Sequence, residues 1–168
     1  MTTTIPRASA ILGAARTLAA KLLLAVPIDR AALSQAMTES AGGSDAEGAW
    51  EQRDSFEALE VALSLAIPEL VGRMDVGAAI STLEALAREL PTHTVRSEDQ
   101  IQFQQFSTPP ALARLAVHLA RLSSDDVLFE PSAGTGIIAS LAKGAVKDLI
   151  LNELEPTRAN LLEAVFPG

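Results

Sequence analysis

The sequence contains no cysteine, only two histidines and few aromatic residues. Without cysteine the chain can form neither disulfides nor thiolate zinc sites, and two histidines are too few for a histidine-rich metal cluster. We therefore expect no metal site and a reducing, cytoplasmic location. Basic residues are also scarce, because 13 Lys and Arg stand against 21 Asp and Glu, a formal net charge of −8. An autonomous DNA-binding domain has a basic face, so this chain alone is expected to bind DNA poorly.

Long hydrophobic runs are limited to residues 8–26, where Arg16 and Lys21 interrupt the apolar pattern. These charges and the lack of a cleavage site argue against a signal peptide or a membrane span, so we predict an ordinary buried helix and no membrane association. Alanine and leucine dominate, with 48% of the residues hydrophobic and 4% aromatic. This composition predicts a mostly helical protein that packs through small side chains.

Residues 1–95 are predicted to form a helical N-terminal domain. Apolar residues recur at helical spacing in four segments, 9–25, 30–40, 55–70 and 76–90. Asp29 and Asp75 are predicted N-caps, and Pro68 is expected to kink or end the third helix. Trp50, the only tryptophan, is interpreted as a core anchor of this helical block.

The pattern changes after a polar stretch that ends near residue 105. Short apolar runs at 127–129 and 149–151 are each followed closely by an acidic residue and then by a helical pattern, at 136–145 and 157–166. This β-α-β-α order predicts the start of a parallel, doubly wound sheet. The predicted fold is therefore mostly α followed by α/β, a helical bundle and then an incomplete Rossmann-like domain over residues 96–168.

The strongest motif is F-E-P-S-A-G-T-G at 129–136, where the first strand leads into a helix. Glycines there let the backbone approach a ligand, and open α/β sheets bind ligands at the carboxyl ends of their strands. Glu153 follows the second strand and can accept hydrogen bonds from both hydroxyls of a ribose. A turn without a ligand and a solvated acid are the simpler alternatives, which the combination of the two features disfavours.

Gly134, Gly136 and Ala139 also match the dinucleotide motif G-x-G-x-x-A, so an NAD(P)-binding domain is an alternative. Glu130 argues against it, because an acid at the exit of the first strand opposes a pyrophosphate. S-adenosylmethionine has no phosphate and carries an ammonium and a sulfonium, which Glu130 suits.

A third motif, Q-Q-F-S-T-P-P, lies upstream at 104–110. Thr108 is a predicted N-cap and Pro109 the predicted first residue of a helix. That helix carries four apolar residues on one face, Leu112, Leu115, Ala116 and Leu119. Its amides and hydroxyls could meet a ligand carboxylate, although local physics alone favours a simple capped helix.

Taken in this order, the three motifs resemble those of class I S-adenosylmethionine-dependent DNA methyltransferases of the adenine type. The resemblance implies that the threonine-proline segment and the glycine loop hold the methionine part of the cofactor, and that the acid after the second strand holds its ribose. The cofactor-binding residues implied in this way are Phe106, Ser107, Thr108, Glu130, Ser132, Ala133, Gly134, Gly136 and Glu153.

The segments 42–50, 90–110 and 149–168 look like the N-terminal region of strawberry-notch-type methyltransferase-helicase proteins, large plasmid and phage proteins that include antirestriction DNA methylases. That family grips the target amine with an N-P-P-F or D-P-P-Y element, which this sequence lacks. The resemblance implies an enzyme as the parent protein, with no catalytic residue in this chain and DNA contacts made by downstream parts. It also allows the helical block to dock onto the helicase or other regions.

A non-catalytic interaction module with a vestigial cofactor site is the alternative, because two strands leave a sheet edge exposed. The two histidines are assigned no catalytic role. His93 lies in a polar connector and is interpreted as a structural or surface residue. His118 lies in an apolar helix, where a hydrogen-bonded packing role is the simpler interpretation.

Overall fold

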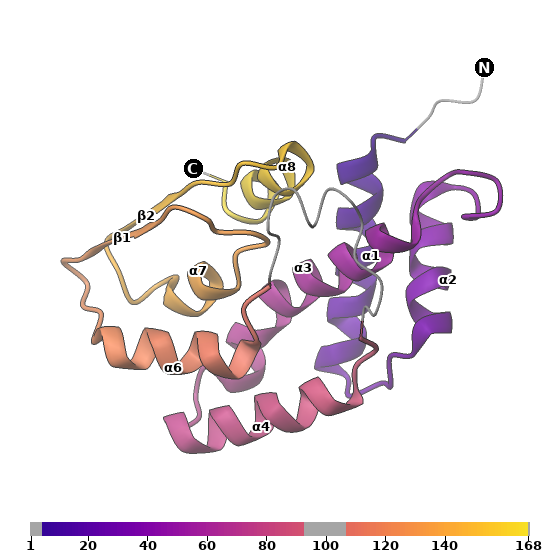
Figure 1. Cartoon of the computed structure of the whole chain (residues 1–168). Coiled ribbons are helices and arrows are strands. Elements are labelled where there is room, and N and C mark those ends of the chain that lie inside the picture. Colours follow the sequence, from indigo (N-terminus) through magenta and orange to yellow (C-terminus); the bar gives the residue numbers. More distant parts are fainter. Residues whose placement is uncertain (1–4, 93–106, 168) are drawn as a thin grey trace.

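The computed structural model describes residues 5–92 and 107–167. Within these ranges the chain forms seven helices and two strands (Figure 1). The elements are α1 (Arg7–Leu23), α2 (Arg30–Ala41), α3 (Gln52–Val71), α4 (Val76–Glu89), α6 (Pro110–Ala120), β1 (Val127–Glu130), α7 (Ile137–Ala142), β2 (Asp148–Leu151) and α8 (Pro156–Val165). The prediction of a mostly helical chain with parallel strands near its end is confirmed.

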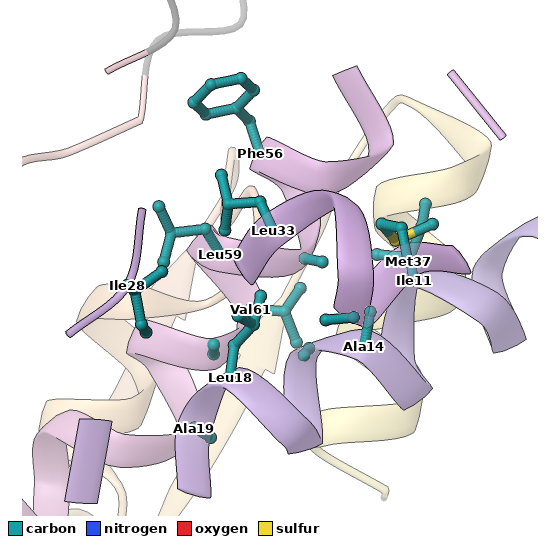
Figure 2. Packing of buried hydrophobic residues seen from close by; sticks show 14 of the residues in the cluster. Ile11, Ala14, Leu18, Ala19, Ile28, Leu33, Met37, Phe56, Leu59 and Val61 are labelled. Carbon is teal, nitrogen blue, oxygen red and sulfur yellow. The ribbon is translucent and has the colours of Figure 1, made fainter. Parts of the chain in front are cut away.

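The main hydrophobic core lies between α1, α2 and α3, with α3 crossing the middle of the molecule (Figures 1 and 2). Its large buried side chains include Ile11 and Leu18 of α1 and Leu33 and Met37 of α2. Alanines on α1 allow the helix axes to approach closely, as the composition predicted. The apolar N-terminal segment is thus a buried helix, and no helix in the described ranges is long and apolar enough to cross a membrane.

The predicted caps and anchor of the helical block are confirmed. Asp29, the N-cap of α2, accepts a hydrogen bond from the Ala32 amide at 2.8 Å. Asp75 is the N-cap of α4 and likewise accepts a hydrogen bond from a backbone amide in the first turn of the helix. Trp50 is buried, and its indole N–H donates to the Gly43 carbonyl. Pro68 does not end α3, because it lies in the last turn and the helix continues through it to Val71.

A second, smaller core joins the helical block to the C-terminal part. It consists of completely buried side chains of α3 and α4 that pack against apolar residues of α6 and α7. These side chains are Ile67, Val71, Ala79 and Leu83. Leu161 of α8 belongs to the main core. The two predicted domains therefore share apolar cores.

β1 and β2 form a two-stranded parallel sheet in which Val127 pairs with Asp148 and Glu130 with Leu151. Alternate residues point to opposite faces of a strand. One face is partly covered and the other is open, because Val127, Phe129 and Ile150 are all at least half exposed. In Figure 1 the sheet lies above α7, with α6 and α4 below.

Three predictions for α6 are corrected, namely Thr108 as the N-cap, Pro109 as the first helical residue and His118 as a packing residue. The helix begins at Pro110, Pro109 is its N-cap, and Thr108 makes no cap hydrogen bond. The reason is that a residue before proline is driven into extended backbone, so Pro109, with ψ 135°, cannot be helical. The apolar face with Leu112 and Leu119 is turned to solvent, since α6 packs through Ala113. His118 is exposed and is no packing residue, because it lies away from that contact.

Candidate functional site

Backbone hydrogen bonds tie the loop after β1 to the segment after β2. The Ala133 amide donates to the Asn152 carbonyl at 2.8 Å, and the Asn152 amide donates to the Glu130 carbonyl at 3.0 Å. The Asn152 side chain donates to the Pro131 carbonyl. Because parallel strands end at the same edge of the sheet, these contacts bring two sequence motifs, 129–136 and 149–155, into one site.

The two glycines of the loop have different roles. Both have positive φ, 56° at Gly134 and 84° at Gly136. A Cβ at Gly136 would overlap the ring of Phe166 and crowd Leu162, so this glycine allows the loop to pack on α8. A Cβ at Gly134 would meet only Arg158 Nη1 at 3.8 Å. Gly134 therefore leaves backbone open at the site, whereas Gly136 serves packing.

The carboxylate of Glu153 is held in place by two backbone amides. Its Oε2 accepts from the Gly134 amide at 2.8 Å and its Oε1 from the Glu155 amide at 3.0 Å. Each carboxylate oxygen can accept more than one hydrogen bond, so both remain able to accept from hydroxyl groups. The arrangement fixes the direction of this side chain at the end of β2.

A cavity of about 30 Å³ lies at this loop. It is lined by Ser107, Thr108, Glu130, Ser132, Ala133, Gly134, Thr135, Ile137 and Arg158. Six of the nine residues predicted from the sequence are thus brought together around one space. Gly136 and Glu153 adjoin it without lining it, and Phe106 lies outside the described residues.

Glu130 is the acidic group that lines this cavity. Its Oε2 atom is buried and has no hydrogen-bond partner among the described residues. Burial raises the pKa of Glu130 to about 7, an effect that the backbone amide of Ala139 partly offsets. A buried carboxyl group with a free oxygen is costly unless a partner satisfies it, and a cation is the partner that restores its charged form.

The cavity also contains Arg158, a residue that the sequence motifs did not single out. Arg158 is 4% exposed, and its Nε and Nη2 donate to both carboxylate oxygens of Glu57 at 2.8–3.0 Å. Nη2 also donates to Glu60 at 3.1 Å. The partners belong to α3, about a hundred residues earlier in the chain, so no local pattern around Arg158 could have revealed them.

The charges of this buried cluster affect one another. Burial lowers the pKa of Arg158, but Glu57 and Glu60 outweigh this effect and raise it, so the guanidinium stays charged. Burial raises the pKa of Glu57 to about 7, with Glu60 adding to the rise and Arg158 opposing it. Arg158 therefore favours the ionised form of Glu57 against the effects of burial and of Glu60.

The helical block lines a second pocket beside the site. A larger pocket of about 450 Å³ lies between α3, α4 and the start of α6, and shares Ser107, Thr108, Thr135 and Ile137 with the small cavity. Its lining is mainly apolar, and Glu57 contributes to it. The small cavity thus adjoins a space bounded by the N-terminal helices.

Comparisons of the chain with protein-family models, with curated proteins and with solved structures give no match. They therefore assign the chain to no family.

Proposed function

We propose that the chain binds S-adenosylmethionine at the carboxyl ends of β1 and β2, as the cofactor-binding part of an adenine-type DNA methyltransferase of the strawberry-notch kind. In this proposal the order β1, α7, β2, α8 is the start of a Rossmann-like fold. The observation that carries it is the single cavity lined by Ser107, Thr108 and Glu130, with Glu153 hydrogen-bonded to its loop. Three motifs that are separate in the sequence meet there.

The charge of Glu130 supports this ligand over a dinucleotide. A buried carboxyl group next to a pyrophosphate would add repulsion to its desolvation cost, whereas the ammonium of an amino acid satisfies its free oxygen. The ligand is therefore expected to be a cation on the side of the cavity that Glu130 lines.

The residues of this chain bind and orient the cofactor in the proposal. Glu130 accepts a hydrogen bond from the ammonium, the loop at Ala133 and Gly134 surrounds the methionine part, and Glu153 accepts from the ribose hydroxyls. The cofactor supplies the methyl group when it is bound. The sequence has no N-P-P-F or D-P-P-Y element, so the proposal assigns cofactor binding, and not base methylation, to these 168 residues.

Calorimetric titration tests the proposal. We expect S-adenosylmethionine or S-adenosylhomocysteine to bind with micromolar affinity, roughly −8 kcal/mol, and NADH to give no heat. Glu130→Gln should weaken binding about tenfold or more, because it removes a charge-assisted hydrogen bond. Glu84→Gln, at an exposed position on α4, is the matched control and should leave binding unchanged. Binding of NADH without binding of either adenosyl ligand would overturn the proposal.

The open side of the sheet favours a second candidate, a non-catalytic interaction module. Parallel sheets are normally covered on both faces, yet Phe129 and Ile150 are exposed, and a groove of about 580 Å³ lined by β2 residues adjoins α8. The partner that suits this geometry is another strand with an apolar helix, which would extend and cover the sheet. Light scattering that shows a monodisperse monomer, unchanged by Phe129→Ser and Ile150→Ser together, would count against this candidate.

A further inference from the structure

Arg158 is suited to a ligand-binding role that rests on the proposed function. Two residues that line the small cavity have side chains of opposite charge type, the acid Glu130 and the base Arg158. Both residues therefore border one cavity of about 30 Å³. An α-amino acid head group presents an ammonium and a carboxylate on one carbon atom, and so matches such a pair.

The hydrogen bonds of Arg158 leave one of its nitrogens available. Nε and Nη2 are used by Glu57 and Glu60, whereas the hydrogen bonds among the described residues do not use Nη1. Nη1 is also the atom nearest to the open side of Gly134. A guanidinium has five N–H donors in a fixed plane, so anchoring one edge of the group directs the remaining donors.

We propose that Arg158 binds the carboxylate of the cofactor's amino acid through Nη1, opposite the ammonium site at Glu130, and that Glu57 and Glu60 of the helical block are positioning residues that hold it there. The head group enters past Ser107 and Thr108, which are exposed at the rim of the cavity. The N-terminal helices thus complete the cofactor site. Two elements separated by about a hundred residues of chain act as one binding unit.

The first test uses the unmodified protein and two ligands that differ only in the carboxylate. S-adenosylhomocysteine carries it, and S-adenosyl-3-thiopropylamine keeps the adenosine, the thioether and the amine but lacks it. We expect calorimetry to show about tenfold to hundredfold tighter binding of S-adenosylhomocysteine, the effect of one charge-assisted contact. Equal affinity for the two ligands would overturn the inference while leaving the proposed function intact. If neither ligand binds, the proposed function fails, and the role of Arg158 fails with it.

The second test uses variants chosen to leave no ionised Glu57 without a partner. Arg158→Lys retains the charge, but one ammonium cannot hold both glutamates and also reach the ligand, so the preference for the carboxylate should disappear. Glu57→Gln combined with Arg158→Met removes the arginine without leaving Glu57 ionised and unpaired, and should behave in the same way.

The positioning role of Glu60 is tested by comparing the affinities of the two ligands in one variant. Glu60→Gln should weaken binding of S-adenosylhomocysteine severalfold and leave the affinity for the thiopropylamine ligand unchanged, since the guanidinium loses one of its anchors. A structural role alone would weaken both ligands by the same factor. Equal losses for the two ligands in all three variants, with circular dichroism showing folded protein, would contradict the inference.

Discussion

Replacing Arg158 by methionine should destabilise the protein strongly. The substitution removes the shared partner of Glu57 and Glu60, whose side chains are 11% and 27% exposed, together with their hydrogen bonds to the guanidinium. Breaking a buried ion pair by removing one partner costs about 3–5 kcal/mol. Protonation of Glu57 limits this cost, because its pKa is already raised to about 7. We therefore expect about 3 kcal/mol at pH 7, and less at pH 5.5.

Urea denaturation followed by circular dichroism measures this loss, which corresponds to a decrease of roughly 6–12 °C in melting temperature for a chain of this size. Arg88→Met is the matched control, because Arg88 is 76% exposed and pairs with Glu84 on the same helix. Such surface pairs contribute about 0.3–0.5 kcal/mol. A loss at Arg158 as small as the loss at Arg88, or one that grows as pH falls, would refute the buried, charged arrangement.

Three further outcomes are expected. Affinity for S-adenosylhomocysteine should rise with pH up to about 7 and then level off, because the ligand's ammonium favours ionised Glu130, whose pKa is raised to about 7. Glu130→Gln should make the affinity independent of pH over this range. A pH-independent affinity in the unmodified protein would contradict this prediction. The same raised pKa means that Glu130 contributes stability below its ordinary pKa of 4.5 that is lost as pH rises through 7, so urea midpoints of the ligand-free protein should fall over this range. Gly136→Ala should lower the free energy of unfolding by at least about 2 kcal/mol more than Gly144→Ala does. Both glycines have positive φ, but only a Cβ at Gly136 would clash with Phe166. Equal losses in urea denaturation would argue against that contact.

The elements that sequence could predict are those specified by local chemistry. Asp29 and Asp75 cap helices, and the strand-glycine-helix order of the C-terminal part follows from residues close together in the chain. Even so, α6 begins one residue later than predicted, because Pro110 drives Pro109 into extended backbone and this effect outweighs the capping preference of Thr108.

The features that sequence could not predict depend on distant contacts. Which face of α6 is buried is decided by its contacts with α4 and α7, so the apolar character of the helix did not show that His118 is exposed. Arg158 follows an ordinary helix start, and only the folded chain brings it to Glu57. The packing role of Gly136 likewise requires Phe166, thirty residues later.

The most direct test of the central claim is a nuclear magnetic resonance titration of the ¹⁵N-labelled chain with S-adenosylhomocysteine. Cofactor binding at the strand ends predicts shifts of the amide signals of Ala133, Gly134 and Glu155, since two of these amides bind Glu153 and the third belongs to the cavity loop. NADH at the same concentration should shift none of them. Unchanged signals at these amides at millimolar S-adenosylhomocysteine, or equal shifts with NADH, would contradict the account.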